Sequence, residues 1–244
     1  MPHLGEMSDT LLLIVLLVPA LVIAIVFHEV AHGFVALLLG DPTAKERRRL
    51  SLNPIRHVDP VGTLLVPGGL ALVGGPIFGW AKPVPVIAQR LDNPRFGMMA
   101  VAAAGPATNF ILGTIGAILL GMALPLGAHV IASDTGMSLI AGMDGSPDMV
   151  ASALFYFLLI NIFLAVFNLL PIPPFDGSHI VEGAMPRRWV HLYEKLRPFG
   201  MLLFFGLVAL TWFAPQLGVL ENTVGVPVNW VMNRYLELAN WIAA

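Results

Sequence analysis

The chain contains no cysteine. It therefore has no disulfide and no thiolate ligand, so any zinc site must be built from His, Asp or Glu. Charge is also scarce: Asp, Glu, Lys and Arg make up 11% of 244 residues, against about a quarter in soluble domains. With 57% hydrophobic residues, this composition predicts an integral membrane protein. The net charge of −2 argues against a nucleic-acid partner.

The first ten residues contain no Lys or Arg. A secretory signal peptide begins with a basic region, so we expect the first apolar run to be retained rather than cleaved. That run is longer than the roughly 20 residues that cross a bilayer. It must therefore tilt, bend at Pro19 or continue past the membrane surface, and Gly40-Asp41-Pro42 ends it.

Four long apolar runs predict membrane-spanning helices. They cover residues 11–39, 96–124, 149–170 and 199–214. The predicted fold class is an all-α multi-spanning membrane protein with about four main transmembrane helices. We expect residues 1–214 to form one membrane-embedded domain and residues 215–244 a C-terminal tail. The last part of the tail carries Trp230 and Trp241, which is typical of an interfacial helix.

The positions of the basic residues predict the orientation. Eight of the 13 Lys and Arg lie between the first and second runs, four lie between the third and fourth, and Arg234 lies in the tail. The positive-inside rule then places both basic loops in the cytoplasm and both chain ends outside, in a membrane that we expect to be a bacterial inner membrane. Lys45–Arg49 is interpreted as part of this charge anchor.

Residues 50–86 are apolar but rich in glycine and proline. Repeated breakers exclude a continuous helix and favour short β segments or re-entrant loops. Such a backbone is tolerated at membrane depth only where protein or a watery cavity surrounds it, so we expect this region to pack near a functional site. His57 lies in it, either as an ordinary loop histidine or as a support for a metal ligand.

The sequence His28-Glu29-Val30-Ala31-His32 lies inside the first apolar run. In a helix, residues i and i+4 share a face, so the two imidazoles can take two corners of a tetrahedral zinc site. Glu29 is adjacent and can act on a metal-bound water. The pattern also occurs by chance, but ionisable side chains inside a membrane span are costly and usually functional.

A second motif supplies a carboxylate. The segment Leu170-Pro171-Ile172-Pro173-Pro174-Phe175-Asp176-Gly177 cannot continue a helix because of its prolines. Asp176 is therefore either part of a turn that leaves the membrane or the third zinc ligand, which would leave a fourth position for water. His179 is a rival ligand. Asn109, in the middle of the second run, either joins helices by hydrogen bonds or faces the site.

These motifs together resemble the site-2 protease family of intramembrane zinc metalloproteases. The resemblance rests on His28-Glu29-x-x-His32, Gly105-Pro106-x-x-Asn109 and Asn168-x-x-Pro171-x-Pro173-x-x-Asp176-Gly177, with the segments 51–54 and 80–85. It covers about residues 11–179 and implies that His28, His32 and Asp176 bind Zn²⁺. It further implies that Glu29 is the catalytic base and that Asn109 and Asn168 lie close to the centre. The chain lacks a PDZ-sized or CBS-sized insertion.

The resemblance implies hydrolysis of a transmembrane segment of another membrane protein, in contact with lipid. Glu29 would take a proton from water, and Asn109 would donate to the developing oxyanion. A helical substrate must unwind first, and an exposed strand within residues 50–86 would hold it by β-addition. The competing interpretation is a metal carrier or sensor that uses the same ligands without hydrolysis; a carrier has no need of Glu29 as a base. The sequence indicates neither the substrate nor the oligomeric state.

Overall fold

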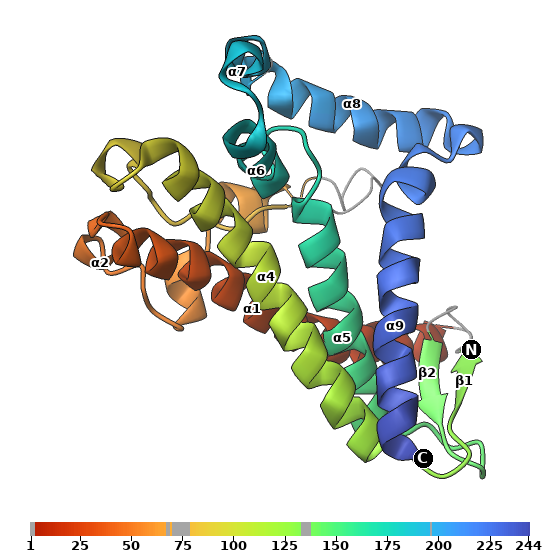
Figure 1. Ribbon diagram of the computed structural model, residues 1–244. Helices are drawn as coiled ribbons and strands as arrows, with labels where there is room; N and C mark the ends of the chain where they lie inside the picture. Colours follow the sequence, from red (N-terminus) through yellow and green to blue (C-terminus); the bar gives the residue numbers. More distant parts are fainter. Residues whose placement is uncertain (1–2, 67–68, 70–78, 133–137, 196) are drawn as a thin grey trace. The chain divides into compact units, whose positions relative to one another are not determined.

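The computed structural model describes residues 3–66, 69, 79–132, 138–195 and 197–244. Figure 1 shows a helical chain whose longer helices are α1 (His3–Leu38), α4 (Pro94–Ala123), α5 (Met149–Asn168), α8 (Gly200–Phe213) and α9 (Val226–Ala243). The shorter ones are α2 (Thr43–Glu46), α6 (Asp176–Ala184) and α7 (Arg187–Glu194).

Three helices in the described part of the chain are long and apolar enough to cross a membrane: Ile14–Leu38 within α1, Pro94–Ala123 and Met149–Asn168. These are three of the four predicted spans, and the all-α multi-spanning class is confirmed. The fourth predicted span forms α8, which has 14 residues, fewer than the roughly 20 that a perpendicular crossing requires.

The ends of α1 follow from local chemistry. The helix begins at His3, before the apolar run, and passes through Pro19 without interruption. It stops at Leu38, and Gly40 then adopts φ = 101°, a left-handed conformation that glycine adopts without steric cost. The spans expose many large apolar side chains, among them Leu11, Val15 and Ile111. Such surfaces require lipid around them.

The described chain divides into two compact units. Unit 1 comprises Met1–Ala24, Asn109–Asn168 and Met201–Ala244, and unit 2 comprises Ile25–Thr108 and Leu169–Gly200. Both α1 and α4 contribute one part to each unit. The two units are described separately below.

Unit 1 contains a β-hairpin that the sequence did not predict. Strands β1 (His129–Ala132) and β2 (Ser138–Ala141) pair antiparallel, with His129 opposite Ala141. The hairpin packs on α5, where the Ile140 amide donates to Ser152 Oγ at 2.9 Å. Its strands have only four residues each, too short for alternation of apolar and polar residues to distinguish them from a loop.

The C-terminal helix α9 packs against α5 in unit 1, as Figure 1 shows. It also touches α4: the Tyr235 hydroxyl donates to the Phe110 carbonyl at 3.3 Å. A Cβ on Gly121 would lie 2.4 Å from the Ala239 carbonyl oxygen, so the glycine permits this close helix contact. An interfacial position for α9 stays a prediction.

Unit 2 holds most of residues 50–86. The region forms a 3-10 turn at Pro54–His57, a π-helical turn at Pro60–Leu65 and a run without helix or strand over residues 79–87. No spanning helix and no strand occurs in its described parts, 50–66, 69 and 79–86. The expected irregular structure is thus confirmed there, and residues 67–68 and 70–78 lie outside the described residues.

Candidate metal centre

Two histidines of α1 lie on one face of the helix, one turn apart. His28 Nε2 and His32 Nε2 are 3.0 Å apart, and both side chains are buried. Gly33 follows directly, and a Cβ there would lie within 2.9 Å of Leu50, Val84 and Ala44 side chains. The missing side chain therefore lets other segments of unit 2 pack closely against the helix beside the histidines.

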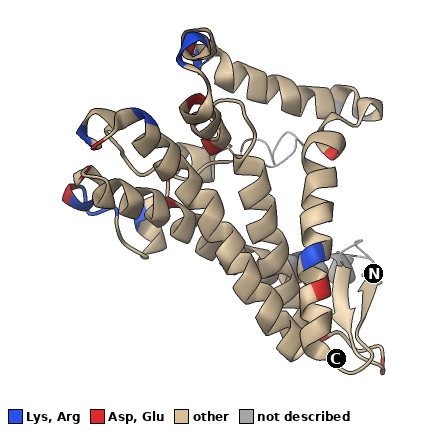
Figure 2. Cartoon of the chain, viewed as in Figure 1, with Lys and Arg blue, Asp and Glu red and all other residues tan. Residues whose placement is uncertain are grey.

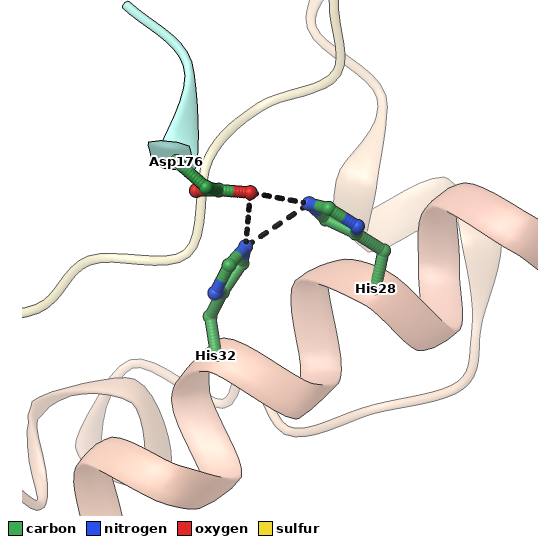
Figure 3. A group of neighbouring side chains, drawn as sticks. All are labelled: His28, His32 and Asp176. Carbon is green, nitrogen blue, oxygen red and sulfur yellow. Dashed lines mark hydrogen bonds and ion pairs between the residues drawn. The ribbon is translucent and has the colours of Figure 1, made fainter. Parts of the chain in front are cut away.

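Asp176 reaches the histidines from the Pro-rich segment. The prolines end the helical path after Asn168, and α6 begins at Asp176. Asp176 Oδ2 lies 3.1 Å from His28 Nε2 and 3.4 Å from His32 Nε2, and Figure 3 shows the three side chains converging.

The spacing of the three ligand atoms fits zinc. Ligands 2.0–2.1 Å from a tetrahedral zinc lie about 3.3 Å apart, close to the 3.0, 3.1 and 3.4 Å observed. His32 Nδ1 donates to the Val101 carbonyl at 2.7 Å, which leaves the Nε2 lone pair of the neutral ring directed at the other two ligands. Asp176 Oδ2 is buried without a hydrogen bond, as expected of an atom that binds a metal.

Glycine at position 105 makes room for this centre. A Cβ there would lie 2.5 Å from His32 Nε2 and 2.6 Å from His28 Nε2. These distances are far below van der Waals contact, and the atoms belong to the presumed ligands themselves. Only glycine lets α4 pass this close to the two imidazoles.

The Glu29 side chain is oriented by the run over residues 79–87. Its Oε2 accepts a hydrogen bond from the Val84 amide at 2.8 Å. Two other backbone amides of this run also donate hydrogen bonds. The Trp80 amide donates to the Gly62 carbonyl, and the Lys82 amide donates to the His57 carbonyl. Hydrogen bonds from alternate residues are typical of an extended chain, which points alternate residues to one side. Trp80, Lys82 and Val84 thus hold the run against other segments of unit 2.

Residues 16–210 match the profile of Peptidase family M50. The chain is 38% identical over 191 residues to a Bacillus subtilis protein named "Putative zinc metalloprotease YwhC", with 78% of each chain covered. The chain belongs to peptidase family M50. It is also 24% identical to "Putative zinc metalloprotease Rip2" of Mycolicibacterium smegmatis, over 78% of this chain and 64% of that one. No solved structure matches.

Membership of M50 confirms the resemblance to site-2 proteases. The protein is a zinc metalloprotease, and its cofactor is Zn²⁺. Among the described residues, His28, His32 and Asp176 form the one group that could hold a metal ion. The rival ligand His179 is not in that group: its Nδ1 lies 3.8 Å from Glu182 Oε2 and 3.4 Å from an Arg197 nitrogen.

Asn109 and Asn168, which the resemblance places close to the centre, form hydrogen bonds with residues other than the proposed ligands, and so does His57. Asn109 belongs to unit 1, where its amide donates to the Ala24 carbonyl at 3.2 Å and to Asn161 Oδ1 at 2.9 Å. The Asn168 amide donates to Leu164. His57 is buried and its Nε2 donates to the Ser51 carbonyl at 2.7 Å. Roles for these three in catalysis stay predictions.

Arg49 is buried, unlike its basic neighbours, and its role as a charge anchor stays a prediction. It is 7% exposed, whereas Lys45, Arg47 and Arg48 are exposed. Its guanidinium donates to the Lys82 carbonyl. Burial lowers the pKa of Arg49, and the charge of Glu29 acts in the opposite direction. Arg49 therefore fixes the run that orients the presumed base.

Asp41 holds the far end of the same run. It is fully buried, and its Oδ2 accepts from the Ile87 amide at 2.6 Å, while its Oδ1 accepts from the Thr43 amide at 3.0 Å. Burial raises the pKa of Asp41, but these hydrogen bonds lower it by more. The partners of Arg49 and Asp41 are 33 and 46 residues away in sequence, so no local pattern could have identified either contact.

Replacing Gly105 by alanine should impair zinc binding. The added Cβ must push the two imidazoles away from their positions in the centre. Even the loss of a residue that hydrogen-bonds to a ligand costs about 10–100-fold in metal affinity. Zinc content and affinity of purified Gly105→Ala protein measure the effect. Gly206→Ala is the matched control, because a Cβ there meets nothing within 4 Å. Equal zinc affinity in the two variants would contradict the packing argument.

Replacing Arg49 by methionine should destabilise the protein by about 1–3 kcal/mol, the usual cost of an unpaired buried polar group. The Lys82 carbonyl loses its guanidinium donor, while the methionine keeps most of the side-chain volume. Unfolding in mixed micelles measures the change. Arg47→Met removes the same charge from an exposed position and should change stability little. A loss as large in Arg47→Met would show that charge alone matters.

Proposed function

We propose that this M50 protease is an intramembrane endopeptidase that cuts transmembrane segments of other membrane proteins. One observation carries the proposal: His28 and His32 lie inside the candidate span Ile14–Leu38, which supports a site at membrane depth. Ionisable groups at that depth mark functional sites. A protease whose centre lies there meets transmembrane segments rather than soluble chains.

In the proposed chemistry His28, His32 and Asp176 hold the zinc. Zinc held there would supply Lewis-acid polarisation of the scissile carbonyl. Glu29 takes the proton from water and passes it to the leaving nitrogen. The Val84 amide supports this role, because its 2.8 Å hydrogen bond to Oε2 fixes the carboxylate orientation. Asn109 is proposed as an oxyanion donor, a role that requires one of its two amide hydrogens to leave Ala24 or Asn161.

The substrate must be extended where it is cut, because a helix hides its amides. The run over residues 79–87 donates hydrogen bonds from alternate residues, as an extended chain does, and Trp80, Lys82 and Pro83 are exposed. We propose that it holds the unwound substrate by β-addition. Residues 1–214 would form the protease domain, and residues 215–244 a C-terminal tail with an interfacial helix.

The charge distribution supports a site on the cytoplasmic side. Unit 2, which contains all three proposed ligands, carries 12 of the 13 Lys and Arg and 8 of the 15 Asp and Glu. Figure 2 shows basic residues on α2, at the start of α4 and on α7. The positive-inside rule assigns the basic loops of this unit to the cytoplasm, and we propose that the site lies in the cytoplasmic half of a bacterial inner membrane.

Cysteine accessibility tests this orientation, because the native chain has no cysteine. Ser146 and Arg47 are both exposed. Ser146→Cys should react with an impermeant maleimide added to intact cells, and Arg47→Cys should react only after the cells are opened. The opposite labelling pattern would overturn the proposed orientation.

Proteolysis is tested in cells. Membrane proteomes of wild-type and Glu29→Gln cells are compared for membrane proteins that accumulate uncut in the variant. The proposal expects at least one such protein, with a shortened form in wild-type cells that ends inside an apolar segment. Identical proteomes, with metal uptake changed instead, would favour the carrier interpretation.

A further inference from the structure

Helix α7 (Arg187–Glu194) in unit 2 has two contrasting faces. With 3.6 residues per turn, one face carries apolar and aromatic side chains and the other carries charge. The apolar face consists of Trp189, Val190, Leu192 and Tyr193, and the polar face of Arg187, Arg188, His191 and Glu194. The metal centre makes no use of either face.

Only half of the apolar face is covered by the protein. Val190 and Tyr193 are half-buried, and the Tyr193 hydroxyl donates to the Pro171 carbonyl at 2.6 Å. In contrast, Trp189 is 50% exposed and Leu192 is 51% exposed. Phe199, in the turn after the helix, is also exposed. Trp189 and Leu192 form an open apolar strip along α7.

Positive charge borders this strip. Arg187, Arg188 and Lys195 are exposed, and the Arg188 guanidinium lies 5.8 Å from the centre of the Trp189 ring. Figure 2 shows the blue basic residues on α7. Glu194 is one opposing charge on the helix, and Glu182 is neutralised by an ion pair with Arg197. The surface fits an anionic partner that also offers an apolar layer.

We propose that α7 docks on the bilayer surface by binding anionic phospholipid headgroups. Trp189 and Leu192 would enter the boundary between headgroups and acyl chains, and Arg187, Arg188 and Lys195 would pair with lipid phosphates. The chain itself favours lipid over a soluble acidic protein. The α5 span ends at Asn168, 19 residues before α7 begins, so the helix is tethered close to a membrane.

The proposal is tested with one fluorophore on the intact protein. Leu192→Cys gives a unique thiol, which is labelled with the environment-sensitive dye NBD. The protein is placed in nanodiscs of phosphatidylcholine alone or with added phosphatidylglycerol. NBD emission should brighten and shift to the blue when phosphatidylglycerol is present, and high salt should reverse the shift. Trp189→Cys provides a second, equally exposed label position.

Charge variants locate the effect. Arg187→Gln with Arg188→Gln should weaken the docking equilibrium roughly 25-fold. The matched control, Lys45→Gln with Arg47→Gln, removes the same charge from another exposed stretch of unit 2 and should leave the emission unchanged. Equal emission in both lipid mixtures, or an equal loss in the control, would overturn the proposal. A blue shift induced by soluble poly-glutamate in phosphatidylcholine discs would assign the surface to an acidic protein instead.

Discussion

Glu29→Gln should abolish peptide cleavage while zinc stays bound. A general base typically contributes about 10²–10⁴-fold to the rate, and an amide cannot accept the proton from water at neutral pH. The substitution is nearly isosteric, and the Gln carbonyl can still accept the hydrogen bond that the Val84 amide gives to Glu29. The fold and the three proposed ligands should therefore survive unchanged.

The matched control is Glu46→Gln. Glu46 is exposed and pairs with Arg90 at 3.0 Å. The substitution therefore removes a carboxylate that is not part of the proposed metal centre. Zinc content and turnover of a transmembrane peptide are measured for the wild-type protein, Glu29→Gln and Glu46→Gln. Near-normal turnover by Glu29→Gln would exclude Glu29 as the base and favour another group or the carrier interpretation.

Removing a proposed ligand should empty the site. His28→Ala and Asp176→Ala each delete one of three atoms that lie 3.0–3.4 Å from one another. We expect zinc affinity to fall by more than the roughly 10–100-fold seen when only a ligand's partner is lost. Activity should be lost with the metal and should not return when moderate zinc is added.

Two controls separate ligand loss from general damage. His191→Ala and Asp144→Ala remove the same side-chain types from exposed positions. Zinc bound per chain is measured after dialysis against a weak chelator. Full occupancy in both His28→Ala and Asp176→Ala would contradict the ligand assignment, whatever their activity.

Local patterns predicted much of this molecule. Apolar runs located α4, α5 and α8 within two residues at each end, because helix length and breakers are encoded locally. The closeness of His28 and His32 was predictable for the same reason, because i, i+4 spacing fixes the pair. Local pattern left Asp176 either in a turn or as a ligand, and its grouping with the histidines came from the family resemblance.

Other features depend on contacts between distant segments. Val84 meets Glu29 across 55 positions, and Arg49 meets Lys82 across 33. In the sequence Arg49 is one of several neighbouring basic residues, and only the fold shows that it alone is buried. The hairpin in residues 129–141 escaped prediction because its strands become stable only by packing on α5.

The position of the cut tests the central claim most directly. Membrane proteins purified from Glu29→Gln cells are incubated with wild-type protease in nanodiscs, and newly formed N-termini are mapped by mass spectrometry. We predict new termini inside apolar segments of about 20 residues, in the half facing the cytoplasm, and none with Glu29→Gln or zinc-depleted protease. New termini confined to soluble loops, or equal numbers with Glu29→Gln protease, would contradict intramembrane proteolysis by this centre.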